Sequence, residues 1–251
     1  MFSYAVEDWL LLFYIYCVFG WCFESTYVSL RTRHPVNRGF MQAPFLPLYG
    51  SGAVLLLIIG RIFADNLLLT YIFSCIGATL LEFYTGMAME RIFKIKYWDY
   101  SRQPFNIQGH VCLMSSLFWG VLGIFLTRVL HAPVETLVLG IPGQVKVILV
   151  IVITAVLSWD FALSFRLAME LREVLMEMEE AEAVLRGMEN QQVSEERRLK
   201  VKKFLEKLAG IRNGIQAELS ARYEVKISRK YCTMNGNIQK LYFGGFHKNK
   251  V

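Results

Sequence analysis

Long apolar runs separated by short polar breaks fill the first two thirds of the chain, and they constrain its fold more than any other feature. A helix needs about 20 apolar residues to cross the hydrocarbon core of a bilayer. Five segments reach or approach this length: residues 9–30, 48–64, 67–89, 111–130 and 145–167. We therefore predict an all-α protein in which residues 1–167 form a polytopic membrane helix bundle with five spans.

Lysine and arginine are unevenly distributed between the polar breaks. Loops that remain in the cytoplasm carry an excess of these residues. The breaks after the first and third spans hold Arg31, Arg33, Arg38, Arg91, Lys94, Lys96 and Arg102, whereas the opposite side holds Arg61, Arg128 and Lys146. We predict a cell-membrane protein with its N-terminus outside and its C-terminus in the cytoplasm. An odd number of spans also requires the two ends to lie on opposite sides.

Residues 168–226 are rich in charge and predict a cytoplasmic helical domain. Apolar residues recur there at alternating steps of four and three: Leu167, Leu171, Val174, Met178, Ala181, Leu185 and Met188. This spacing is typical of a coiled-coil seam that continues from the fifth span. A second apolar pattern over 201–219 predicts an antiparallel helical hairpin. The first arm is acidic and the second is basic, so opposite charges favour pairing of the two arms with each other. The alternative is pairing with another subunit, which would give a homo-oligomer or a hetero-complex.

Residues 227–251 combine basic and aromatic side chains. This composition suits a membrane surface. An unstructured terminus is the alternative. The positive net charge of +6 does not predict nucleic-acid binding, because many of the basic residues flank apolar spans.

Glu24, Glu82 and Asp160 are ionisable residues inside predicted spans. Such residues are costly in a bilayer and often mark functional sites. Each lies about four or five residues past the midpoint of a span that runs outside to inside, which is about 6–8 Å at 1.5 Å per residue. We predict one acidic layer that binds a cation or a proton, or receives an arginine such as Arg38 or Arg91. The alternative is that each carboxylate is buried for structural reasons alone.

The two cytoplasmic loops resemble each other. Both contain Pro-Phe, 60 residues apart, and an intramembrane glutamate precedes each pair. We infer a parallel duplication of residues 9–64 and 67–130, with chance similarity as the alternative. Proline and glycine favour non-helical backbone, so we expect both loops to fold back over the cytoplasmic mouth of the bundle. The candidate loop residues are Asn37, Arg38, Gly39, Pro44, Pro47, Tyr49 and Gly50 in the first, and Trp98, Asp99, Tyr100, Pro104, Asn106 and Gly109 in the second.

Gly20-Trp21 before Glu24, the stretches 37–40 and 47–50, and residues 98–101 with Asn106 and Gly109 share their order and spacing with a known family. Over about residues 8–130 the chain resembles the bacterial CmpB-like family of type IV ABC-transporter membrane proteins. The resemblance implies a transport permease or a permease subunit. The chain has no GxxxxGK[ST] motif, so a separate ATPase is the expected partner.

Two other functions remain open. A membrane-embedded enzyme that acts on a lipid-linked substrate would use Glu24, Glu82, Asp99 and His110. The chain lacks HExxH, GxSxG and Cys/His clusters, which makes an enzyme the less favoured reading, and no cofactor is indicated. A structural or regulatory membrane protein is the third alternative. His34 and His131 are expected in loops.

Overall fold

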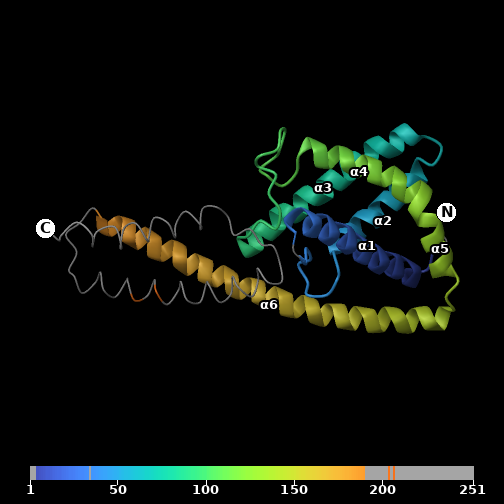
Figure 1. Cartoon of the computed structure of the whole chain (residues 1–251). Helices are drawn as coiled ribbons and strands as arrows, with labels where there is room; N and C mark the ends of the chain where they lie inside the picture. The colour runs from blue at the N-terminus through green and yellow to red at the C-terminus, as the bar shows by residue number, and fades with distance from the viewer. Residues whose placement is uncertain (1–3, 34, 190–202, 204–205, 207–251) are drawn as a thin grey trace. The chain divides into compact units, whose positions relative to one another are not determined.

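The computed structural model describes residues 4–33, 35–189, 203 and 206 of the 251-residue chain (Figure 1). Its helices are α1 (Val6–Thr32), α2 (Pro47–Ile62), α3 (Leu67–Phe93), α4 (Leu113–Phe125), α5 (His131–Leu139) and α6 (Gly143–Glu189), with a π-helical turn, η1 (Leu126–Leu130), between α4 and α5. The described residues contain no strand, and Ile107 and Val111 form an isolated bridge. The all-α prediction is confirmed for this part of the chain.

The chain divides into two compact units. The described residues of the first unit are 4–33, 35–88 and 98–166, and those of the second include 89–97 and 167–189. Both α3 and α6 pass from the first unit into the second.

Four helical segments are long and apolar enough to cross a membrane: Val6–Arg31, Leu67–Phe93, Leu113–Leu139 and Gly143–Glu173. The apolar helix α2 is shorter, with 16 residues. Its length of about 24 Å, at 1.5 Å per residue, falls short of a hydrocarbon core of about 30 Å. Each of these five segments overlaps one of the five predicted spans. The chain is therefore a membrane protein with four to five helices able to span the bilayer, and the exact number of crossings and their direction stay predictions.

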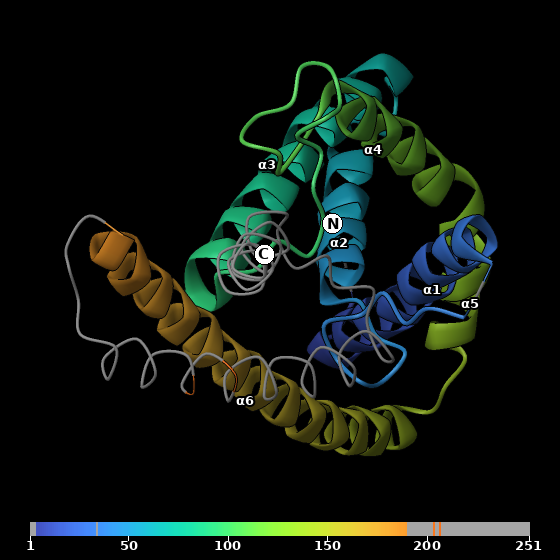
Figure 2. The same ribbon diagram turned by 60° about the vertical axis from the view of Figure 1, so that its left-hand side comes forward.

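The fourth segment is longer than the sequence pattern indicated. Instead of ending near residue 130, it continues through η1 into α5 and ends at Leu139. Figure 2 shows the rod changing direction between α4 and α5. A π turn adds a residue to a helix and shifts the faces that follow it. The helical spacing of apolar residues, with a period of 3.6, is therefore interrupted at this turn.

His131 begins α5, so the prediction that it lies in a loop is wrong. Its Nδ1 lies 3.0 Å from the hydroxyl of Tyr16, and its Nε2 lies 3.1 Å from the hydroxyl of Tyr4. Nearby, the Lys146 ammonium lies 2.6 Å from the carboxylate of Asp8, and both side chains are buried. These contacts join the start of α1 to α5 and α6.

Helix α6 is continuous over 47 residues. The first arm of the predicted hairpin is therefore an extension of the fifth predicted span. In the second unit, Phe93, Ile95, Ala168, Leu171 and Leu175 are buried. The second arm of the hairpin lies outside the described residues apart from Lys203 and Glu206, and the tail at 227–251 lies wholly outside them.

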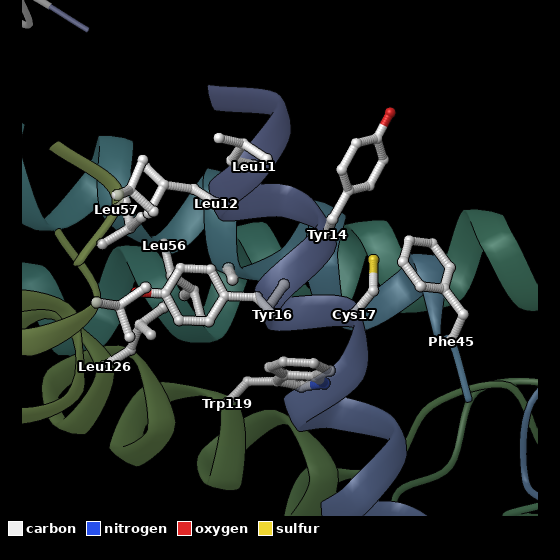
Figure 3. Packing of buried hydrophobic residues seen from close by; sticks show 14 of the residues in the cluster. Leu11, Leu12, Tyr14, Tyr16, Cys17, Phe45, Leu56, Leu57, Trp119 and Leu126 are labelled. Atoms are coloured by element: carbon white, nitrogen blue, oxygen red, sulfur yellow. The ribbon is translucent and has the colours of Figure 1, made fainter. Parts of the chain in front are cut away.

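The core of the first unit depends on close approach of α1 and α2. Figure 3 shows Tyr16 and Cys17 projecting from α1, with the ring of Trp119 nearby. A Cβ atom at Gly50 of α2 would lie 2.2 Å from the sulfur of Cys17 and 2.7 Å from the carbonyl oxygen of Phe13. Only glycine allows the two helices to pack at this distance.

We expect Gly50→Ala to lower the stability of the bundle. The added methyl group must displace the Phe13 backbone as well as a side chain, and overpacking of this kind costs about 1–3 kcal/mol. Thermal unfolding of the purified chain in detergent measures the effect. The control is Gly143→Ala, because a Cβ atom at Gly143 meets nothing within 4 Å. Equal melting temperatures for the two variants would contradict the packing described here.

Candidate functional site

Glu24 of α1 is bound by both the first loop and α2. The hydroxyl of Tyr49 donates to its Oε2 at 2.8 Å. The Nη2 atom of Arg38 lies 3.5 Å from Oε1, and the two charged side chains are 19% and 27% exposed for Arg38 and Glu24. The Nε atom of Arg38 is buried and has no hydrogen-bond partner among the described residues. The charge of Glu24 is thus balanced by Arg38, whose Nε–H makes no hydrogen bond among the described residues.

The first loop, residues 33–46, holds Arg38 in place through Asn37. The Asn37 side-chain oxygen accepts from the indole of Trp21 at 2.7 Å and from the backbone N–H of Gly39 at 2.9 Å. Its amide nitrogen donates to the carbonyl of Gln42 at 3.1 Å. The backbone N–H of Arg38 donates to Ser25 at 3.3 Å. One asparagine therefore ties both sides of the loop to α1.

Glu82 of α3 is only 5% exposed and is bound by α4 and the second loop. The indole N–H of Trp119 donates to its Oε2 at 3.0 Å, and the hydroxyl of Tyr100 donates to its Oε1 at 3.2 Å. The side chain of Ser115 also lies beside this carboxyl group. All three partners are neutral, and none of the ion pairs among the described residues includes Glu82.

The second loop, residues 94–112, positions Tyr100 by bonds within the loop. The backbone N–H of Tyr100 donates to the carbonyl of Gly109 at 2.9 Å, and the indole of Trp98 donates to the carbonyl of His110 at 2.7 Å. Gly109 has a φ of 77°, a conformation that favours glycine. The side-chain oxygen of Asn106 accepts a hydrogen bond from the backbone N–H of Gly109 at 3.2 Å, and its amide nitrogen donates to the carbonyl of Gln103 at 2.8 Å. Asn106 therefore organises its loop as Asn37 does in the first.

Asp99 makes a turn at the start of this loop. Its Oδ1 accepts from the backbone N–H of Ser101 at 3.0 Å and from the Ser101 hydroxyl at 2.5 Å. Such a turn satisfies a loop backbone locally.

A contact between two aromatic rings links the groups around the two glutamates. The rings of Tyr49 and Trp119, which donate to Glu24 and Glu82 respectively, have centroids 5.5 Å apart. Burial, followed by the negative charges of Glu82 and then Glu24, raises the pKa of Tyr100 above its ordinary value. Tyr100 therefore stays protonated through the neutral range and can donate. We call Glu24, Arg38, Tyr49, Glu82, Tyr100, Ser115 and Trp119 the carboxylate network.

The contacts around the two glutamates match position by position. Gly50 of α2 faces Phe13 and Cys17 of α1, and Gly120 of α4 faces Tyr71 and Cys75 of α3. On the first helix of each pair, positions 13, 17 and 24 correspond to 71, 75 and 82, a constant offset of 58. On the second helix, positions 49 and 50 correspond to 119 and 120, an offset of 70. In each pair the aromatic residue before the glycine donates to the glutamate.

The repeated Pro-Phe does not take part in this correspondence. Phe45 is 5% exposed and belongs to the core, whereas Phe105 is 79% exposed. Pro44 and Pro104 are both exposed, and Pro47 begins α2.

Asp160 of α6 is bound by the first loop and stands apart from the carboxylate network. Its Oδ2 accepts from the backbone N–H of Ala43 at 3.0 Å. The ring centroids of Phe40 and Phe161 lie 5.6 Å apart beside it. No hydrogen bond or ion pair among the described residues joins Asp160 to either glutamate. Arg91, the other arginine candidate, lies near the end of α3 in the second unit.

Trp119 and Ser115 were not among the residues selected from the sequence. The signal that could have found Trp119 is the pair Trp119-Gly120, which repeats the pattern of Tyr49-Gly50. Ser115 offers no comparable signal, because serine is common near the start of helices.

The chemistry that the network supports follows from its two carboxyl groups. Within the described residues, no group of three or more His, Cys, Asp or Glu side chains is placed to hold a metal ion. A carboxylate with neutral donors beside a carboxylate with an arginine can instead exchange a proton or receive a cationic group.

A family model described as "Putative ABC-transporter type IV" matches residues 11–165, which is more than half of the chain. No curated protein and no solved structure matches it. The matched residues include every member of the carboxylate network. Together with the apolar helices, the match indicates a membrane protein related to transport.

We expect Tyr100→Phe to destabilise the first unit by about 1–2 kcal/mol, because it removes a donor from a buried carboxyl group without changing the ring. The melting temperature of the purified chain should fall accordingly. Tyr84→Phe makes the same chemical change at a side chain that is 58% exposed and should leave the melting temperature unchanged. A fall of equal size in both variants would show that the Tyr100 hydroxyl does not stabilise Glu82.

Proposed function

We propose, since this chain belongs to the "Putative ABC-transporter type IV" family, that it is a transport permease or permease subunit that works with a separate ATPase. The observation that supports this role best is the carboxylate network, in which each loop supplies a partner to a glutamate inside a span-forming helix. Its 251 residues contain no GxxxxGK[ST] motif, so ATP hydrolysis requires another chain.

The loops are the proposed route by which the ATPase acts on the membrane helices. Arg38 extends from the first loop to Glu24, and Tyr100 extends from the second loop to Glu82. The excess of lysine and arginine in these loops supports a cytoplasmic position for both. A partner that moves either loop would withdraw a charge or a hydrogen bond from the network.

The proposed permease contains two parallel repeats, residues 9–64 and 67–130. The matched contacts at Gly50 and Gly120 support this duplication better than the repeated Pro-Phe does. Transporters built from repeats often form their site where the repeats meet. The contact between Tyr49 and Trp119 is such a place, because each ring comes from a different repeat.

The remaining parts of the proposal concern the cytoplasmic region. Helix α6 extends the membrane segment to Glu189. An acidic first arm and a basic second arm over residues 168–226 support a helical hairpin that recruits the ATPase or a second copy of the chain. The basic aromatic tail at 227–251 is proposed to contact the lipid surface.

The proposal is tested by purifying the tagged chain from the membranes of its own host and measuring ATP hydrolysis after reconstitution into liposomes. We expect a subunit with a GxxxxGK[ST] motif to co-purify and to hydrolyse ATP. Glu82→Gln should lower hydrolysis by about tenfold or more, which corresponds to about 1.4 kcal/mol. Asp65→Asn, an exposed carboxylate between α2 and α3, is the control and should have no effect.

The abundance of each variant separates transport from a purely structural role. If Glu82→Gln accumulates normally but hydrolysis is lost, the network acts in function. If no ATP-hydrolysing subunit accompanies the chain, or if Glu82→Gln hydrolyses ATP normally, the permease proposal is wrong.

A further inference from the structure

The two matched glutamates have different surroundings. Glu24 is paired with Arg38 at 3.5 Å and is partly exposed. Glu82 is 5% exposed and is bound only by neutral donors. Burying an ionised carboxylate without a cation is costly, and such a group tends to take up a proton instead. The difference between the two repeats therefore concerns the charge each one can carry.

None of the charged and titratable groups around Glu82 forms an ion pair with it among the described residues. They are Glu24 on α1, Arg38 in the first loop, Tyr49 on α2, Tyr100 and His110 in the second loop, and Cys112 before α4. The charge of Arg38 is balanced by Glu24. His110 faces Gly86, one helical turn from Glu82, and none of the ion pairs among the described residues joins His110 to Glu82. An ionised Glu82 would therefore leave the network with a net negative charge.

The hydrogen bonds of Glu82 define which oxygen can carry a proton. The indole of Trp119 is a donor only, so Oε2 must remain an acceptor. A hydroxyl group both donates and accepts, so Tyr100 can receive a hydrogen bond from Oε1 as readily as it can give one. Protonation at Oε1 then requires only that the Tyr100 hydroxyl turn.

We infer that Glu82 is a proton-binding site, with the proton on Oε1 and donated to Tyr100. The proton enters from water at the second loop, where residues 101–105 are exposed. Uptake converts the carboxylate to a carboxylic acid and removes one negative charge from the network. Release reverses the bond to Tyr100 and so changes the anchoring of the second loop. The use of this proton rests on the proposed transport role, but its binding does not.

Infrared spectroscopy of the full chain in lipid nanodiscs tests the inference, with the proton itself as the probe. At pH 7 a glutamate in water is ionised. We expect the wild-type chain to show the carbonyl stretch of a protonated carboxyl group at this pH. Glu82→Gln should lose the band and Glu24→Gln should keep it.

Tyr100→Phe keeps the test valid if Glu82→Gln does not fold. Loss of the hydrogen bond to Tyr100 should shift the band to higher frequency, whereas Tyr84→Phe should leave it in place. The inference is overturned if wild type lacks the band at pH 7, if the band survives in Glu82→Gln, or if Tyr100→Phe does not shift it. Because no ATP or partner is used, this result is independent of the ATPase experiment.

Discussion

A carboxyl group within a membrane span must find its hydrogen-bond donors inside the protein, because lipid offers none. In this chain the loops supply some of those donors. Arg38 and the backbone N–H of Ala43 come from the first loop, and Tyr100 comes from the second. The loops consequently fold inward against the helices, and their asparagine and glycine residues hold the backbone in the shape that this requires.

The close packing of the helices follows from the same arrangement. Tyr49 and Trp119 reach a glutamate only if α2 lies near α1 and α4 lies near α3. The glycine that follows each aromatic residue permits this approach, since any side chain at Gly50 or Gly120 would meet a cysteine sulfur. An aromatic residue followed by a glycine that faces a cysteine thus lets two helices pack closely enough for the aromatic side chain to donate to the carboxyl group.

Much of the fold could be predicted from the sequence, because span length and the cost of buried charge are properties of single segments. The five apolar segments and the continuity of α6 with the first arm were accessible in this way. The sequence left both Arg38 and Arg91 open as partners of Glu24 or Glu82, and Arg38 lies beside Glu24. The π turn at Leu126–Leu130 was not, because nothing in residue type marks it. The correspondence of Trp119 with Tyr49 was obscured because Trp119 follows Glu82 by 37 residues whereas Tyr49 follows Glu24 by 25, which changes the offset from 58 to 70. Pro-Phe gave an intermediate offset of 60 and pointed to residues with different surroundings.

The helices α3 and α6 both continue into the second unit. They carry Glu82 and Asp160 at equal distances before the point where each helix enters that unit. Glu82 lies seven residues before Met89, where α3 enters the second unit, and Asp160 lies seven residues before Leu167, where α6 does so. Seven residues of helix span about 10.5 Å. An α-helix transmits rotation and translation along its axis better than a loop does, because its backbone bonds are internal. A partner that turned the extended part of either helix would act on a carboxyl group that a loop also holds, Glu82 through Tyr100 and Asp160 through Ala43.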